Sequence, residues 1–409
     1  MSGTAKGAEA KSVGLLALGL GLVGFDRFMI MPMFPVLQRD LGLSYQDLGL
    51  ITGSLAVSWG LFSIFAGSLT DRIGTRKVVV GSIILFSLIG GASGLAVGLG
   101  SMVAIRILIG AFEGAYAPAA LVATLKASEP AHHGRNVGIQ QAALPLFGLA
   151  LAPLLVTQML TVVPWRWIFA LVTLPGLLIA FGLYKTLRPM TLAESAAHTT
   201  VRDTGTHAWR DLFRYRNIRL NIVAMFCWLN CIIVLTALLP GYLSDFLHLT
   251  LPRMGIVLSG LGFGATLGDL VMPWLSDFIG RKTVAVIDIL GTATGLVIFA
   301  RSGADVWVLF ACLFIAAFFL HNLIGLTTGP LSVEAVPPAL MNSASGLVIG
   351  LGEIFGGGLA PILAGFVAQH FGIQYILHLA IGGLAIGLVV VLSLRETGRD
   401  FSLKERRSP

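Results

Sequence analysis

Charged residues are scarce in this sequence. Asp, Glu, Lys and Arg make up 11% of the 409 residues, while hydrophobic residues make up 56% and the mean hydropathy is +0.88. A soluble domain carries about 25% charged residues, so these few charges could not cover a water-exposed surface. The composition excludes a soluble globular protein and indicates that most of the exterior contacts lipid.

The sequence also lacks the patterns that are typical of enzymes and of disulfide-bonded proteins. It contains only three cysteines, Cys227, Cys231 and Cys312, all inside apolar runs, which favours packing over disulfides or a metal site. We find no phosphate-binding glycine loop, no His-Glu-x-x-His pair and no serine elbow. We therefore expect no enzyme activity, no metal and no cofactor other than a proton as coupling ion, with an ion gradient rather than ATP as the energy source.

Long apolar runs account for most of the chain. Twelve of them are bounded by turn-forming or charged residues, and about 20 apolar residues suffice for a helix to span a bilayer. Strands are excluded, because an open sheet edge cannot be satisfied in lipid. We predict an all-α integral membrane protein with twelve transmembrane helices at about 12–35, 46–66, 78–98, 101–124, 137–160, 166–187, 219–244, 253–275, 283–300, 306–329, 343–368 and 371–394.

Lysine and arginine are distributed unequally between the two ends of these helices. If the N-terminus is cytoplasmic, 21 of the 27 lie in cytoplasmic segments; the outer loops hold Arg39, Arg166, Arg253 and Arg301, and two lie within spans. This asymmetry predicts that both termini are cytoplasmic. The net charge of +7 is thus explained by topology, and we expect no nucleic-acid partner. A basic stretch in mid-chain divides the protein into a six-helix bundle (1–187), a cytoplasmic linker (188–218), a second six-helix bundle (219–394) and a tail (395–409).

A motif after the second span recurs after the eighth, at an offset of 206 residues. The first copy runs from Gly67 to Lys77 and the second from Pro273 to Lys282. Such a repeat in a twelve-span chain is typical of a two-bundle transporter. The first copy resembles the signature G-x-x-x-D-[RK]-x-G-x-[RK] of the major facilitator superfamily. The resemblance implies the fold of that superfamily, with two pseudo-symmetric bundles, and a gating role for these residues: Gly67, Asp71, Arg72, Gly74, Arg76, Asp277, Gly280 and Arg281.

Four charged residues lie inside the first and fourth apolar spans. Asp26 and Arg27 occur in the first, and Arg106 and Glu113 in the fourth. Together they resemble the functional charges of the anion:cation symporter family, which moves sugar acids and similar organic anions. The resemblance implies substrate binding by Arg27 and Arg106, and proton coupling by Glu113 and Asp26. Two features depart from that family: the second span reads Trp59-Gly-Leu-Phe, and a glutamate stands at 353.

The physical cost of intramembrane charge supports the same four residues. Charged side chains in a membrane helix usually line an interior cavity and pair with one another. At about 1.5 Å per residue, Asp26 and Arg106 lie at one level and can make contact. Glu113 lies about 10 Å deeper than Arg106, and we expect it to form a second station along the pathway.

Other polar residues inside spans have two interpretations each, as cavity lining or as helix packing. These candidates are Glu353, His321, Tyr116, Asn230 and Asn322. Asp269 and Asp288 are expected instead to pair with the loop at Arg281-Lys282.

The function that we predict is proton-coupled symport, the uptake of a small organic anion by alternating access. The fifth span, around Pro145 and Pro153, lacks the glycine-proline pattern of the superfamily's antiporters. The alternative is a proton-driven efflux antiporter for drugs or metabolites, and a third interpretation is a sensor with the same fold. We expect a monomer in a cell membrane, most simply the inner membrane of a bacterium.

Overall fold

Twelve long apolar helices form the protein in the computed structural model, which describes residues 3–129, 132–187, 211–337 and 340–395. The first half contributes six membrane-crossing segments, the fifth of them interrupted by a π-helical stretch, η3. Its elements are α1 (Gly3–Leu41), α2 (Tyr45–Ile73), α3 (Thr75–Ala92), α4 (Leu99–Ala127), α5 (His133–Pro145), η3 (Leu146–Leu151), α6 (Ala152–Met159) and α7 (Trp165–Thr186).

The second half repeats this plan. Its elements are α10 (Arg216–Gly241), η4 (Tyr242–Phe246), α11 (Leu251–Ile279), α12 (Arg281–Arg301), α13 (Val306–Thr328), α14 (Pro330–Val333), α15 (Met341–Gly352), η6 (Glu353–Leu359), α16 (Ala360–Phe371) and α17 (Ile376–Ser393). Twelve of the described helices are long and apolar enough to cross a membrane. The predicted fold class is confirmed. Residues 188–210 of the predicted linker and 396–409 of the predicted tail lie outside the described residues.

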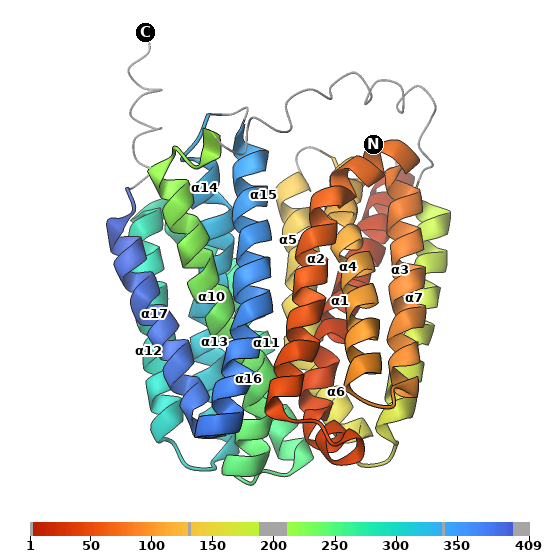
Figure 1. Cartoon of the computed structure of the whole chain (residues 1–409). Helices are drawn as coiled ribbons and strands as arrows, with labels where there is room; N and C mark the ends of the chain where they lie inside the picture. Colours follow the sequence, from red (N-terminus) through yellow and green to blue (C-terminus); the bar gives the residue numbers. More distant parts are fainter. Residues whose placement is uncertain (1–2, 130–131, 188–210, 338–339, 396–409) are drawn as a thin grey trace.

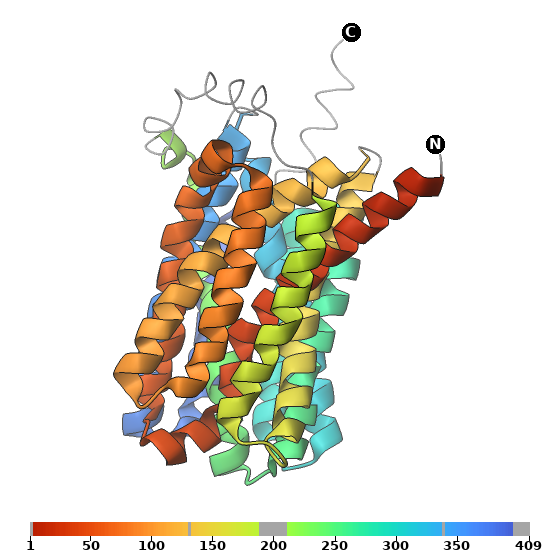
Figure 2. The ribbon, with the colours of Figure 1, turned by 90° about the vertical axis from the view of Figure 1, so that its right-hand side faces the viewer.

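The two halves stand side by side, with all the long helices running in roughly the same direction (Figures 1 and 2). Helix α1 begins and α17 ends at one end of the bundle, which we call the terminal face (Figure 1). The other end, where α1 gives way to α2, we call the opposite face. An even number of crossings brings both ends of the chain to the same side of a membrane.

Proline breaks the fifth and the eleventh crossing at equivalent places. The π-helical stretches η3 and η6 are followed by α6 and α16, each of which carries a proline in its first turn, Pro153 and Pro361. Proline has no backbone N–H, so each of these two residues cannot donate the hydrogen bond that a regular α-helix has at that position. π-Helical segments are frequent at functional sites, and these two flank the interface between the halves.

The turn between the second and third crossings has the same geometry in both halves. Gly74 has φ 92° and Gly280 has φ 106°, a backbone region that only glycine adopts readily. Two residues later, Arg76 donates to the Tyr184 carbonyl oxygen at 2.6 Å, and Lys282 donates to the Leu392 carbonyl oxygen at 2.7 Å. Each cation thus satisfies a free carbonyl at the end of the sixth helix of its half. The sequence repeat at 206 residues is a structural repeat.

Gly74→Ala should destabilise the protein by about 1–3 kcal/mol, the cost of holding a residue with a Cβ in this backbone region. Thermal unfolding of the purified protein would register this as a lower Tm. Gly81→Ala is the control, because a Cβ there meets nothing within 4 Å and alanine favours the helix. Equal Tm values for the two variants would show that the turn tolerates a side chain.

The halves are in contact at the opposite face. The Tyr45 hydroxyl of α2 donates to the Asp245 carboxylate of η4, and the Tyr45 backbone N–H donates to Gln369 Oε1 of α16 at 3.2 Å. A Cβ on Gly49 would lie only 2.4 Å from the Pro361 carbonyl oxygen, so α2 and α16 touch through their backbones. The two halves are therefore in direct contact at this face.

Candidate functional site

Four charged side chains of the first half lie inside the bundle. Helix α1 carries Asp26 and Arg27, which are 3% and 8% exposed, and α4 carries Arg106 and Glu113, which are 1% and 0% exposed. Each charged side chain in a membrane helix costs several kcal/mol of free energy on insertion. The four residues must therefore offset one another or serve a ligand.

Arg106 uses only part of its guanidinium group. Its Nη1 donates to the Asp26 carbonyl oxygen at 3.0 Å. Its Nε and Nη2 are buried and have no hydrogen-bond partner in the described part of the chain. These two nitrogens form the edge of the guanidinium group that binds a carboxylate with two parallel hydrogen bonds. The structure therefore holds an unused, preoriented carboxylate-binding edge inside the membrane.

Asp26 and Glu113 lie beside each other. Their carboxyl groups interact with each other and with Arg106. Asp26 Oδ2 and both carboxylate oxygens of Glu113 accept no hydrogen bond from a donor group among the described residues. The prediction that Glu113 forms a separate, deeper station was wrong, because Glu113 lies beside Asp26, whose backbone carbonyl oxygen accepts the hydrogen bond from Arg106. Asp26 fits because α3 has Gly90 opposite it, where a Cβ would lie 2.8 Å from Asp26 Oδ1.

Arg27 reaches across to the second half. Its Nη2 lies 2.9 Å from Glu353 Oε2 at the start of η6, and the two side chains are 8% and 13% exposed. Its guanidinium carbon lies 4.8 Å from the centre of the Trp59 ring of α2. Glu353, one of the two features in which the sequence differs from the anion:cation symporter family, is thus the partner of Arg27. Trp59 is the other, and its role as a stacking surface for Arg27 was not foreseen.

His321 and Asp269 form a pair in the second half. His321 Nδ1 of α13 lies 2.8 Å from Asp269 Oδ2 of α11. Gly255 and Gly262 precede Asp269 in α11 at steps of seven residues, and both pack against the first half. A Cβ on Gly255 would lie 2.0 Å from Thr157 Oγ1, and a Cβ on Gly262 would lie 1.9 Å from the Ala150 nitrogen. Residues seven apart share a helix face, so Asp269 lies on the face of α11 turned toward the first half.

Three of the cavity candidates pack between helices. Tyr116 is fully buried and its hydroxyl donates to the Leu16 carbonyl oxygen at 3.3 Å. Asn230 Nδ2 donates to the Leu379 carbonyl oxygen at 3.3 Å, and Asn322 Nδ2 donates to Asp288 Oδ2 at 2.6 Å. These hydrogen bonds agree with the packing interpretation of the three residues, and their role in a cavity stays a prediction.

Two acidic residues also find partners other than the expected ones. Asp269 pairs with His321, and Asp288 accepts a hydrogen bond from Asn322, so neither of these contacts involves the loop at Arg281-Lys282. The expectation that both acids serve that loop was wrong.

The signature loop at the terminal face is described in part. Gly67, Asp71 and Asp277 lie in helices, but their side chains are outside the described part of the structure. Gly74 and Gly280 make the turns described above, and Arg72 is exposed. Arg76 contacts α7, and Arg281 donates to Ser276 Oγ at 2.6 Å and to Glu334 Oε1 at 3.2 Å. The gating role of the loop stays a prediction.

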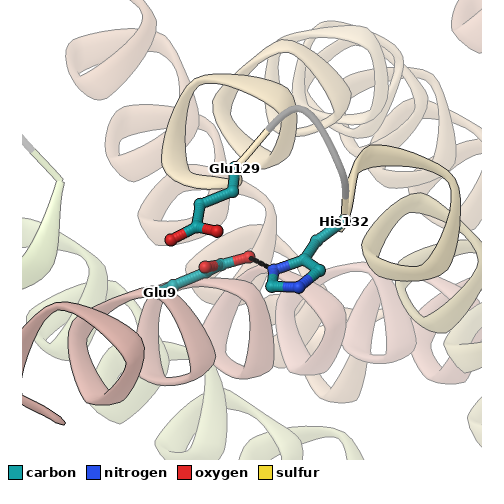
Figure 3. Close-up of side chains that lie close together, drawn as sticks. All are labelled: Glu9, Glu129 and His132. Atoms are coloured by element: carbon teal, nitrogen blue, oxygen red, sulfur yellow. Dashed lines mark hydrogen bonds and ion pairs between the residues drawn. The ribbon is translucent and has the colours of Figure 1, made fainter. Parts of the chain in front are cut away.

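A further polar cluster ties the start of α1 to the segment between α4 and α5 (Figure 3). His132 Nδ1 lies 3.1 Å from Glu9 Oε1, and Asn136 Nδ2 donates to the same oxygen at 2.7 Å. Glu9, Glu129 and His132 each place one potential ligand atom within 4.8 Å of the others, which is close enough for a metal ion. The two hydrogen bonds to Glu9 account for this arrangement as a helix contact.

Gln140 of α5 is another residue that sequence reasoning missed. It is 0% exposed, and neither atom of its amide group has a hydrogen-bond partner among the described residues. The signal was available, since a polar residue inside an apolar span is costly unless it is satisfied.

The fold and the buried charges at Asp26, Arg27, Arg106 and Glu113 define a membrane transporter built from two repeated halves. The chain belongs to the Major Facilitator Superfamily, whose family profile matches residues 16–268 and 220–408. The hexuronate transporter of Bacillus subtilis is 24% identical over 395 residues, with 90% of each chain covered. The sialic acid transporter NanX of Escherichia coli is 23% identical over 395 residues, with 94% of each covered. A solved D-xylose-proton symporter superposes with a TM-score of 0.77 at 17% identity, covering 95% of this chain and 98% of that one. The chain is a transporter and not an enzyme.

Proposed function

We propose that this protein is a proton-coupled symporter that takes up a small organic anion, with Arg106 as the central anion-binding residue. The observation that carries the proposal is the Nε–Nη2 edge of Arg106, buried and without a hydrogen-bond partner in the described residues. A buried N–H group without a hydrogen-bond acceptor costs free energy. A carboxylate would supply acceptors for the Nε and Nη2 groups at once. The relatives named for hexuronate and sialic acid, two carboxylates, agree with an anionic substrate.

Arg27 supplies the second positive charge. It is neutralised by Glu353 at 2.9 Å when no anion is bound. An incoming anion competes with Glu353 for Arg27, and that competition links substrate binding to the contact between the two halves. Such a link is what alternating access requires, because the ligand must favour one arrangement of the halves over the other.

Charge balance supports proton coupling. The buried cluster has three carboxyl groups, Asp26, Glu113 and Glu353, and two guanidinium groups, Arg27 and Arg106. With every group ionised, the cluster carries one excess negative charge, and a bound anion adds another in a poorly solvated place. A proton on the Asp26–Glu113 pair removes one of these charges. Protonation therefore favours anion binding, and by reciprocity a bound anion favours protonation.

The orientation follows from the loop charges. With 21 of the 27 lysines and arginines on the side of the termini, the terminal face is cytoplasmic and the opposite face is external. We propose a bacterial cell membrane, the inner one in a species that has two, in agreement with the bacterial sources of the named relatives. Uptake rather than efflux is favoured by the missing antiporter pattern in the fifth span. In proteoliposomes, an inward proton gradient should drive anion accumulation; expulsion would identify the efflux alternative, and absence of any flux would favour a sensor.

Arg106→Lys should weaken anion binding at least about tenfold, which corresponds to about 1.4 kcal/mol. Lysine keeps the charge but presents no two-pronged edge to a carboxylate. Binding can be measured by ligand-induced thermal stabilisation of the purified protein. The matched control is Arg166→Lys, since Arg166 donates to the Gly94 and Ala96 carbonyl oxygens at 2.8 and 2.9 Å in the loop region of the opposite face. An unchanged affinity in Arg106→Lys would assign Arg106 a structural role.

A further inference from the structure

The space next to the two site arginines has walls that are apolar except for a few groups. A cavity of about 10 Å³ between the halves is lined by Arg27, Arg106 and Thr52, and otherwise by apolar residues that include Ile30, Leu55 and Ile233. This space holds at most about one water molecule. The side chains that now close it are those that an anion on the arginines would touch when the halves separate.

The apolar wall continues beyond this cavity. A neighbouring cavity of about 20 Å³ shares Met31 with the first and is lined by Phe28, Leu149, Leu258 and Leu261 among others. The second cavity, like the first, lies between α1 and α10, and most of the side chains that line the two cavities are apolar.

The hydroxyl groups in these walls are already used. Thr52 Oγ1 donates to the Leu48 carbonyl oxygen at 2.9 Å, one turn earlier in α2. Thr236 Oγ1, in the second cavity, donates to the Ile233 carbonyl oxygen at 3.2 Å. A ligand hydroxyl could therefore find acceptor lone pairs here but no free hydroxyl donor on these two threonines.

Several polar side chains inside the second half already have a partner. Asn322 donates to Asp288, His321 pairs with Asp269, and Glu353 pairs with Arg27. Two further amides are bonded within the same half: Asn221 to Ser332 Oγ at 2.9 Å and Asn230 to the Leu379 carbonyl oxygen at 3.3 Å. Glu353 is thus held by Arg27 of the first half, and the other groups by partners in the second half. Asn221 Oδ1, Asp288 Oδ1 and Asn322 Oδ1 are buried without a hydrogen-bond partner among the described residues, but none of these three residues lines either cavity.

We infer that the substrate is a small monocarboxylate with an apolar body, aromatic or branched aliphatic, rather than a polyhydroxylated sugar acid. This inference rests on the proposed anion transport and adds the chemistry of the rest of the molecule. The carboxylate binds the Arg106 edge, and the body lies against Ile30, Leu55 and Ile233. A sugar acid would bury several hydroxyl groups against aliphatic side chains, and unpaired buried hydroxyls oppose binding. An apolar body gains by leaving water.

The test is a thermal-shift and calorimetric comparison on the purified full-length protein with three groups of probes. Benzoate, phenylacetate and isovalerate are apolar carboxylates, gluconate and glucuronate are hydroxylated ones, and benzamide is a neutral analogue of benzoate. We expect the best apolar carboxylate to bind at least about tenfold more tightly than either hydroxylated acid, and benzamide to bind far more weakly. Tighter binding of a hydroxylated acid would overturn this inference and leave the proposed anion transport intact. Equal binding of benzamide and benzoate, or no binding of any carboxylate, would overturn both.

A pair of variants locates the apolar contact. Ile233→Thr keeps the branch at Cβ but replaces the ethyl group with a hydroxyl in the cavity wall, so it should weaken apolar carboxylates by about fivefold to tenfold without weakening hydroxylated ones. Ile232→Thr makes the same substitution one residue away, at a buried position that is not part of the cavity lining, and should leave the affinities unchanged. An equal effect of both variants, or no effect of Ile233→Thr, would show that the body of the substrate does not touch this wall.

Discussion

Glu113→Gln is expected to abolish gradient-driven accumulation of the anion while preserving anion binding and counterflow exchange. Glutamine is a permanently neutral mimic of the protonated carboxyl group, so the variant needs no proton at this position and cannot release one. Binding should also lose much of its dependence on pH, because the protonation that favours the anion is already imitated. Uptake into proteoliposomes under an inward proton gradient, compared with exchange at zero gradient, measures both properties.

The control for this prediction is Tyr116→Phe. Tyr116 lies one turn away on α4, is equally buried and uses its hydroxyl for a helix contact with Leu16. That variant should still accumulate substrate. If Glu113→Gln concentrated the anion against its gradient, Glu113 could not be the coupling group. Asp26, which shares the proton with it in the proposed scheme, would then be the next residue to test.

Glu353→Ala should reduce stability strongly and increase the response to the anion. Removing one partner of a buried ion pair leaves the other uncompensated, at a cost of about 3–5 kcal/mol. Arg27 keeps its stacking on Trp59 but loses the carboxylate at 2.9 Å. An added anion can replace that carboxylate, so the rise in Tm on adding the anion should exceed that of the parent protein.

Asp288→Ala is the matched control, since Asp288 is a buried carboxyl group of the same half that is bonded to Asn322 and not to an arginine. It should also lower the Tm, but the anion should not restore the loss. A rise in Tm with anion that is the same in Glu353→Ala as in the parent would mean that Arg27 does not receive the substrate.

Much of this architecture could be predicted because the membrane leaves few options. Apolar runs of about 20 residues must be helices in lipid, and the repeat at Gly74 and Gly280 implied two related halves. Both glycines have the positive φ that the motif requires. The charges at Asp26, Arg27, Arg106 and Glu113 could be singled out for the same reason, because a charge inside an apolar span needs a purpose.

The partners of these residues could not be read from sequence. Helix spacing placed Glu113 about 10 Å from Arg106, but the separation along one helix says nothing about how side chains from α1 and α4 converge. The pairing of Arg27 with Glu353 joins residues 326 positions apart, and no periodicity encodes it. Tyr116, Asn230 and Asn322 could be cavity or packing residues in the sequence, because polarity alone does not tell which neighbouring helix a side chain faces.

By itself, then, the sequence determined that this chain crosses the membrane twelve times, in two repeated halves, and carries charge within the first and fourth crossings. These properties depend on local composition and on the absence of water in the bilayer. Only the tertiary structure decided that one edge of the Arg106 guanidinium group has no hydrogen-bond partner among the described residues, that Glu353 of one half neutralises Arg27 of the other, and that the cavity beside these arginines has mostly apolar walls. These contacts depend on how helices that are distant in the sequence pack together. A small rotation of one helix about its axis would give a buried side chain a different partner.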